Sequence, residues 1–199
     1  MFTGLLLLVV IVSGCSGGGG DSDTASTATS TNTSTSVVTT FAGTGIAGST
    51  DATGVAASFS MPSGITNDGT NLYVTDTSNN IIRKIVIATG AVTTLAGTAN
   101  ALGGTADGTG SAASFLTPYG ITTDGTNLYV TTSYGGSIRK IVIATGVVTT
   151  LSGAAAAGLT WPSGIATDGS NLFVTDFGNY TIRKTVIATG VTTTLAGTA

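Results

Sequence analysis

The feature that most constrains the fold of this chain is a sequence unit that occurs three times. The residues NDGTNLYVTD at 67–76 return as TDGTNLYVTT at 123–132 and as TDGSNLFVTD at 167–176. The second copy begins 56 residues after the first, and the third begins 44 residues after the second. The extra 12 residues fall in one loop, which is long at Thr98–Phe115 and short at Ala154–Thr160. Repeats of about 20 to 50 residues are typical of solenoids and propellers.

Each unit contains four short segments with strand patterns, separated by turn residues. In the first unit these segments lie around Gly64-Ile65 and at Asn71–Thr75, Ile81–Ile87 and Ala91–Leu95. An Asp-Gly pair before the second segment favours a tight turn with a positive φ. Within that segment Leu and Val alternate with Tyr, and no segment has a helical pattern. Four antiparallel strands per unit predict an all-β fold made of β-propeller blades.

The same residues resemble the NHL repeat. The resemblance is carried by Pro-x-Gly-Ile at 62–65, Asn-Leu-Tyr-Val-x-Asp at 71–76, Ile-Arg-Lys-Ile at 82–85 and Val-x-Thr-Leu-Ala-Gly at 92–97. The loop GSTDATGVAASF at 48–59 also matches the family, and it returns as GTADGTGSAASF at 104–115. A YVTN-type propeller is a neighbouring family that implies the same architecture. We therefore predict NHL-like propeller repeats over residues 37–199.

One further segment matches only part of a unit. Val37–Phe41 has the pattern of a fourth strand, so we predict three blades of four strands plus one orphan N-terminal strand. The NHL resemblance implies a ring of six blades, closed when an N-terminal strand joins a last blade that lacks its own fourth strand. Here the last unit has a predicted fourth strand, Val191–Leu195. The blades are then either a truncated piece of a longer propeller, which the spare strand favours, or part of a ring completed by self-association.

The N-terminal residues predict export. Leu5–Val12 is a run of eight strongly apolar residues, which suits the central region of a secretory signal, whereas a membrane span takes about 20. The sequence Val-Ser-Gly-Cys at 12–15 resembles the bacterial lipobox, and Cys15 is the only cysteine of the chain. We predict a lipoprotein signal peptide at 1–14 and lipidation of Cys15, with plain secretion as the alternative. No Lys or Arg precedes the apolar run, which departs from the usual signal.

Residues 15–36 have the composition of a tether. They are dominated by Gly, Ser and Thr and offer almost nothing for a hydrophobic core, so we predict a disordered linker. The chain would thus be anchored to the membrane at the cell envelope through the lipid on Cys15. Ser16, where an Asp would retain the protein at the inner membrane, points to the outer membrane in a Gram-negative cell.

The composition narrows the classes of function. The chain has 6 Lys and Arg against 9 Asp, a formal net charge of −3, and neither His nor Glu. So few cations argue against nucleic acid as a partner. The lack of His excludes His-based triads and imidazole-ligated metals from these residues, and we expect no cofactor. A fragment of a metal-dependent propeller hydrolase or lyase, with its ligands on further blades, is the alternative.

The six cations are three repeated pairs that could line a ligand site. They are Arg83-Lys84, Arg139-Lys140 and Arg183-Lys184. Asp76 and Asp176 precede their arginines by seven residues, which predicts an ion pair across a hairpin. The middle unit has Thr132 in that place. Arg139 is therefore the cation predicted to lack an acidic partner and the best ligand-binding candidate, together with Lys84, Lys140 and Lys184.

Trp161 and the aspartates are the remaining candidates. Trp161 stands where the other units have Met61 and Thr117, which predicts packing between blades, with an exposed platform for stacking sugars as the alternative. Asp68, Asp124 and Asp168 precede Gly and are predicted turn residues, whereas Asp51 and Asp107 are weak calcium candidates because each loop has a single carboxylate. The sequence predicts a binding or scaffold module for a protein, peptide or glycan, without catalytic residues, and the fold alone does not name the ligand.

Overall fold

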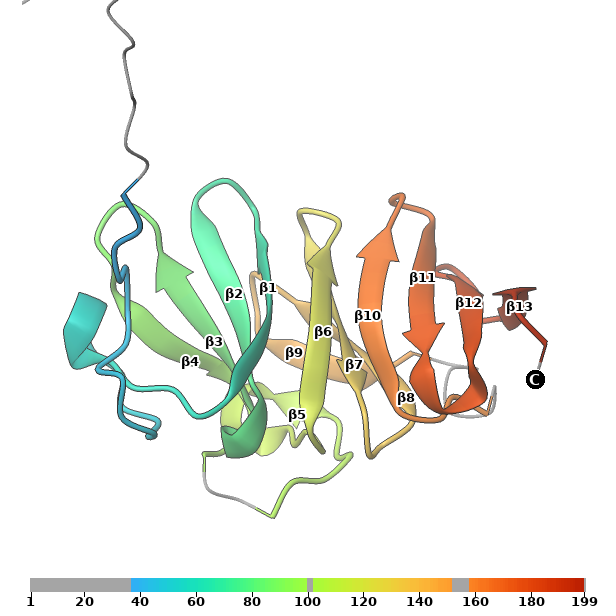
Figure 1. Cartoon of the computed structure of the whole chain (residues 1–199), viewed down its shortest axis with the longest axis horizontal. Helices are drawn as coiled ribbons and strands as arrows, with labels where there is room; N and C mark the ends of the chain where they lie inside the picture. Colours follow the sequence, from blue (N-terminus) through green and yellow to red (C-terminus); the bar gives the residue numbers. More distant parts are fainter. Residues whose placement is uncertain (1–36, 100–101, 152–157, 199) are drawn as a thin grey trace, which may run out of the picture. The chain divides into compact units, whose positions relative to one another are not determined.

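The computed structural model describes residues 37–99, 102–151 and 158–198, so the predicted signal peptide, the tether and Cys15 lie outside the described residues. Residues Val38–Ala199 make up one compact unit. In this unit the chain forms three antiparallel sheets that follow one another in sequence order (Figure 1). The protein is a partial β-propeller, as the repeats predict, and each sheet is one blade.

The strands of each blade are consecutive in sequence. Blade 1 contains β1 (Pro62–Asn67), β2 (Asn71–Asp76), β3 (Ile81–Val86) and β4 (Val92–Ala96). Blade 2 contains β6 (Pro118–Thr123), β7 (Asn127–Thr132), β8 (Ser137–Val142) and β9 (Val147–Thr150), with the short β5 (Gly108–Thr109) paired to the free edge of β9. Blade 3 contains β10 (Pro162–Thr167), β11 (Asn171–Asp176), β12 (Thr181–Val186) and β13 (Thr192–Ala196).

The hydrophobic core lies between the blades. Tyr73 and Ile82 of blade 1 belong to one cluster with residues of blade 2, among them Ile121, Leu128, Val130 and Ile141. Tyr129 and Ile138 of blade 2 belong to an equivalent cluster with Leu172 and Val174 of blade 3. Blade 2 therefore buries one apolar face against blade 1 and the other against blade 3.

The first strands of neighbouring blades approach so closely that glycine is required. A Cβ on Gly64 in β1 would collide with the carbonyl oxygen of Tyr119 in β6. The hydroxyl of Thr75 donates a hydrogen bond of 2.7 Å to the same oxygen. The next junction repeats this contact with Gly120, Ser163 and Thr131, again at 2.7 Å. One glycine and one threonine per blade thus fix the distance to the next blade.

A buried arginine holds the loop that precedes the first strand of blade 1. Arg83 is fully buried and donates hydrogen bonds of 2.8 and 3.0 Å to two backbone carbonyls of the loop 48–59. Its guanidinium also pairs with Asp51 of that loop at 2.8 Å and with Asp76 at 3.0 Å, and it lies 4.9 Å from the ring centre of Phe59. The predicted pair between Asp76 and Arg83 is confirmed, and it is part of a larger buried network.

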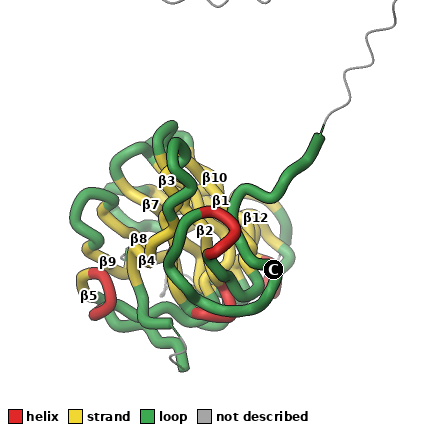
Figure 2. The backbone as a smooth tube through the Cα atoms, turned by 90° about the vertical axis from the view of Figure 1, so that its left-hand side faces the viewer, coloured by secondary structure: helices red, strands yellow, loops and turns green. Residues whose placement is uncertain are grey.

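The structure differs from the sequence prediction at the N-terminal end of the blades. The predicted orphan strand Val37–Phe41 has no strand structure. A strand needs a partner to complete its hydrogen bonds, and no described strand pairs with this segment. The structure also has the short strand β5 within the predicted loop 98–115. Single 3₁₀ turns, the short helical pieces in Figure 2, are a further difference: η1 (Gly54–Ala56), η2 (Thr77–Asn79), η3 (Gly110–Ala112) and η5 (Phe177–Asn179). Among the described residues, no helix is long and apolar enough to cross a membrane.

We expect Arg83→Met to destabilise the protein strongly. The substitution leaves Asp76 buried without its cation, and removal of one partner from a buried ion pair lowers the free energy of unfolding by about 3–5 kcal/mol. Lys84→Met is the matched control, because Lys84 is only half-buried and its replacement should cost about 1 kcal/mol or less. Urea unfolding of the two variants measures the difference, and equal effects would show that packing rather than the ion network holds the loop.

Candidate functional site

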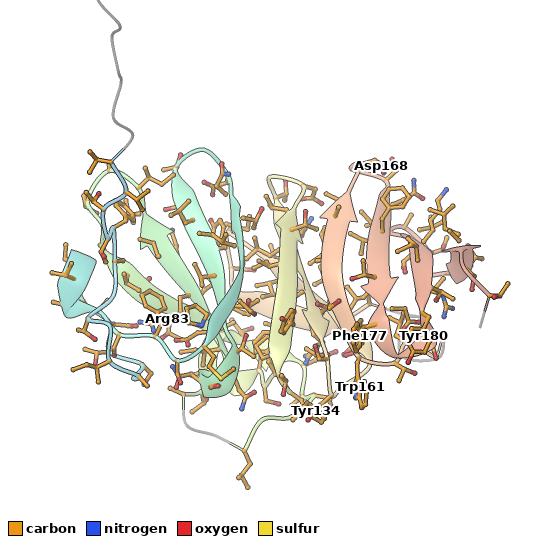
Figure 3. The ribbon with its side chains drawn as sticks, in the orientation of Figure 1. Arg83, Tyr134, Trp161, Asp168, Phe177 and Tyr180 are labelled. Atoms are coloured by element: carbon orange, nitrogen blue, oxygen red, sulfur yellow. The ribbon has the colours of Figure 1, made fainter. Side chains whose placement is uncertain are left out.

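The candidate functional site is a cleft between blades 2 and 3 that is lined mainly by aromatic side chains. Its lining residues are Tyr119, Ser133, Tyr134, Trp161, Ser163 and Phe177. The volume is about 430 Å³, which lies within the range of about 300–1,000 Å³ typical of small-molecule sites. Figure 3 shows Tyr134, Trp161 and Phe177 at the lower end of the blades, with Tyr180 on the same end.

The aromatic residues of the cleft are open to solvent and have unused polar groups. Their exposed fractions are 45% for Tyr119, 73% for Tyr134, 54% for Trp161 and 64% for Phe177. Among the described residues, the two tyrosine hydroxyls and the indole N–H of Trp161 have no hydrogen-bond partner. The cleft therefore offers flat apolar surfaces next to free donors, and none of its lining side chains is charged.

The blade scaffold does not require these aromatic residues. Trp161 has a left-handed φ of 49°, and its equivalents Met61 and Thr117 have nearly the same values of 51° and 55°. The backbone conformation is thus common to all three blades, whereas the indole occurs only in blade 3. Tyr134 likewise occupies the turn position that Ser78 fills in blade 1. Since the same turns form without aromatic residues, packing within the repeat does not explain the cluster.

Of the aromatic residues that line the cleft, the sequence analysis identified only Trp161 as a candidate. Trp161 was predicted mainly to pack between blades, but its exposure places it on the surface of the cleft. Tyr119, Tyr134 and Phe177 were not predicted. The available signal was the comparison of equivalent positions, because each of them stands where another copy has Ser or Thr.

The prediction that Arg139 lacks an acidic partner is wrong. Asp107, which precedes it by 32 residues, comes from the loop 104–115 and pairs with Arg139 at 2.8 Å. Arg139 also donates hydrogen bonds of 2.7 and 2.9 Å to two carbonyls of that loop and is fully buried. Burial lowers the pKa of its guanidinium, and the charge of Asp107 opposes this shift. Because the side chain is enclosed, it is not accessible to a ligand at the surface.

The three lysine candidates lie on the third strand of each blade, away from the cleft. Lys84, Lys140 and Lys184 are half-buried and stand opposite Tyr73, Tyr129 and Phe173 on the neighbouring strand. None of them lines the aromatic cleft. A ligand-binding role for these lysines remains a prediction.

The aspartates have structural roles in the described part of the chain. Asp176 pairs with Arg183 at 3.1 Å, as predicted, whereas Thr132 in blade 2 bonds the hydroxyl of Ser137 at 2.7 Å instead. Asp51 pairs with an arginine, as Asp107 does. No group of three or more metal-ligating His, Cys, Asp or Glu side chains occurs among the described residues.

The aspartates before Gly close the turns between the first and second strands, as predicted. Asp124 accepts hydrogen bonds from the backbone N–H groups of Thr126 and Asn127 at 2.8 and 2.7 Å. Its carboxylate also accepts a hydrogen bond of 2.8 Å from the hydroxyl of Tyr129. Burial raises the pKa of Asp124, but these hydrogen bonds outweigh burial and bring the pKa to about 2. Burial and this hydrogen bond both raise the pKa of Tyr129.

Comparison with known proteins identifies the fold. No protein-family model and no curated protein matches this sequence. Solved structures that resemble it include an auxiliary nutrient binding protein from Bacteroides ovatus (18% identity, TM-score 0.54), a nidogen–laminin complex (23%, 0.54) and virginiamycin B lyase from Staphylococcus aureus (23%, 0.51). The matches cover 66%, 69% and 70% of this chain but only 38%, 48% and 42% of theirs. This chain therefore spans less than half of each propeller-type structure.

The turn aspartates predict a loss of stability in acid. The pKa of Asp124 is about 2 in the folded protein against 3.8 for the ordinary carboxyl, so its contribution is complete above about pH 4 and is lost as the pH falls toward 2. The melting temperature of Asp124→Asn should lie below that of the parent at neutral pH, and the gap should narrow between pH 4 and 2. Thermal unfolding from pH 4 to pH 2 measures the difference in melting temperature between variant and parent. A difference that does not change with pH would contradict the lowered pKa of Asp124.

Proposed function

We propose that this protein is an exported binding module that holds its ligand in the aromatic cleft and has no catalytic activity of its own. The observation that carries the proposal is the clustering of exposed aromatic side chains at one end of blades 2 and 3. Contiguous exposed apolar surface on a protein often marks an interaction site. Loops held by a rigid scaffold are also where binding residues concentrate.

Of the three ligand classes, protein, peptide and glycan, the cleft best suits a neutral glycan. A charged ligand would lose its water without gaining a counter-charge, because no lining side chain is charged. The apolar face of a sugar ring can cover an aromatic ring, while sugar hydroxyls can bond the hydroxyls of Tyr119 and Tyr134 and the N–H of Trp161. A nucleic acid would need cations for its phosphates, and the cleft has none.

We also propose that the blades are NHL-like repeats and that a lipid on Cys15 holds the chain at the cell envelope. The residues that carry the NHL resemblance have consistent places in the blade: Pro62 opens β1, Asp76 ends β2, and Arg83 holds the loop 48–59. The lipobox-like sequence before Cys15 supports the anchor.

The alternative is a fragment of a metal-dependent hydrolase or lyase. The fold does not discriminate between a binding protein and an enzyme, since the resembling structures include both an auxiliary nutrient binding protein and a lyase. The cleft itself favours binding, because its lining residues include no carboxylate, imidazole or thiol that could act as an acid, a base or a metal ligand.

We expect neutral oligosaccharides to change the fluorescence of Trp161, which is the only tryptophan of the chain and lies in the cleft. The full chain carrying Cys15→Ser would be titrated with a panel of neutral saccharides. Tyr134→Ala keeps the reporter but removes one aromatic surface, so it should weaken binding about two- to tenfold, as expected for a contact worth about 0.5–1.5 kcal/mol.

Tyr180→Ala is the matched control for this experiment. Tyr180 is 84% exposed and lies on the same end of the blades, but it does not line the cleft, so its removal should leave the affinity unchanged. A response to a proline-rich peptide but to no saccharide would overturn the glycan assignment. No response to either would overturn the cleft as the binding site.

The anchor is tested by the intact mass of the native protein extracted from the membrane fraction. The expected mass is that of residues 15–199 plus acyl groups, because signal cleavage leaves Cys15 as the lipidated N-terminus. Cys15→Ser should move the protein into the soluble fraction. An unlipidated native mass would contradict the anchor and indicate a freely secreted protein.

A further inference from the structure

In blade 1 a pair of side chains fixes the turn between the second and third strands. The carboxylate of Asp76, at the end of β2, accepts hydrogen bonds from the backbone N–H of Ser60 at 2.7 Å and from the side-chain amide of Asn79 at 2.9 Å. The same amide donates to the carbonyl of Gly48 at 2.7 Å. We name these two side chains the Asp–Asn clamp, because they tie the turn 77–80 to the loop that precedes the blade.

Blade 3 has the same clamp at its own turn, 177–180. The carboxylate of Asp176 accepts a hydrogen bond from the backbone N–H of Thr160 at 2.7 Å and one from the amide of Asn179 at 2.8 Å. Asn179 also donates to the carbonyl of Gly158 at 2.7 Å. The clamp is therefore a shared feature of the two blades on either side of blade 2.

Blade 2 lacks both side chains of the clamp. Thr132 and Gly135 stand in the places of the Asp and the Asn. The hydroxyl of Thr132 is engaged within its own hairpin, and Gly135 has no side chain that could reach the loop 104–115. Among the described residues, no side-chain hydrogen bond therefore ties the turn 133–136 to that loop.

The backbone of this turn also makes fewer hydrogen bonds. In blades 1 and 3 the turn contains a single 3₁₀ turn, η2 or η5, whereas residues 133–136 form none. In blade 1 the N–H of Ser78 donates to the carbonyl of Ser60 at 3.0 Å. The N–H of Tyr134, in the same position of blade 2, donates no hydrogen bond within the described part of the chain.

The path of the turn is nevertheless the same in all three blades. Gly136 has a left-handed φ of 53°, close to 57° for Asn80 and 55° for Tyr180. Blade 2 thus keeps the turn but lacks the bonds that fix it. The two successive glycines at 135 and 136 give the backbone additional freedom. A segment with few buried contacts and few backbone hydrogen bonds opens at a low free-energy cost.

This turn forms one side of the aromatic cleft. Tyr134 lines the cleft and is 73% exposed. Trp161 on the opposite blade is held more firmly, because it lies between Thr160, whose N–H the clamp of blade 3 binds, and Pro162, the first residue of β10. The cleft therefore has a fixed side on blade 3 and a less constrained side on blade 2.

We propose that the turn 133–136 is an adjustable side of the cleft and that Tyr134 moves onto a bound saccharide. This inference rests on the proposed function. The ring of Trp161 stays in place and covers one face of a sugar, while Tyr134 shifts to match the width of the ligand. Contact with the saccharide orders the turn, and this ordering consumes part of the binding free energy. The cleft then accepts neutral saccharides of different widths.

Amide hydrogen exchange of the full chain carrying Cys15→Ser tests the proposal without a label in the cleft. In the absence of saccharide, the amides of 133–136 should exchange at least about tenfold faster than those of 77–80. The neutral saccharide that gives the largest fluorescence response of Trp161 should slow exchange at 133–136 and leave 77–80 unchanged. In Tyr134→Ala the same saccharide should no longer slow exchange in the turn, while Trp161 still responds.

Thr132→Asp combined with Gly135→Asn restores the clamp, because Gly104 supplies the carbonyl that Gly48 supplies in blade 1. Exchange at 133–136 should then fall to the rate at 77–80, and the melting temperature should not fall below that of the parent. Thr132→Asp alone is the matched control. It supplies the carboxylate but not the amide, so it should slow exchange less than the double substitution.

The outcomes separate this inference from the proposed function. Equal exchange at 133–136 and 77–80 without saccharide would overturn the adjustable turn, whatever the cleft binds. A saccharide that changes the fluorescence of Trp161 without slowing exchange at 133–136 would overturn the role of Tyr134 and leave the proposed function intact. A panel in which no saccharide changes the fluorescence of Trp161 would contradict the proposed function and, with it, the movement of Tyr134 onto a saccharide.

Discussion

A four-stranded blade has two apolar faces and cannot bury either of them alone. The rest of this structure follows from that constraint, because each face is covered by a neighbouring blade. The first strands must also come close enough for the hydroxyl of Thr75 to reach the carbonyl of Tyr119, at 2.7 Å. Only glycine at position 64 leaves room for that approach. The two outermost faces, around Ile65 and Ile182, are the exception, because no described blade covers them.

The buried arginines explain why charge has little part in the proposed recognition. A guanidinium can enter the space between the strands and the preceding loop only if its donors are satisfied. Arg83 and Arg139 pair their two terminal nitrogens with loop carbonyls and with aspartates, while the Nε of each has no hydrogen-bond partner among the described residues. Three of the chain's six Lys and Arg residues are the arginines of the third strands, Arg83, Arg139 and Arg183. With so few cations left for the surface, aromatic and hydroxyl groups remain as the means of holding a ligand.

Much of the fold could be predicted from the sequence, because the residue patterns that indicate strands and turns are local and occur in all three units. The alternation of residues in each unit located the strands to within one or two residues, and the hairpin spacing located the pair of Asp76 and Arg83. The partner of Arg139 could not be found in this way, because Asp107 reaches it from a loop 32 residues earlier. The strand predicted at Val37–Phe41 does not form. Its residues have a strand pattern, but a segment without a neighbouring strand cannot form the hydrogen bonds of a sheet.

The cleft illustrates how a repeat protein separates scaffold from function. Positions with the same residue type in all three copies, such as the Arg of the third strand, maintain the blade. Positions at which the copies differ are free to diverge, and the aromatic residues of the cleft occupy such positions. They come from separate copies, Tyr119 from β6 and the others from positions beside the strands, so a search along the chain for one motif does not bring them together. Ser78 of blade 1 is the equivalent of Tyr134 in blade 2, and Met61 of blade 1 is the equivalent of Trp161 in blade 3. The equivalent surface of blade 1 therefore lacks the aromatic rings, and the proposed ligand contacts are concentrated on the last two blades.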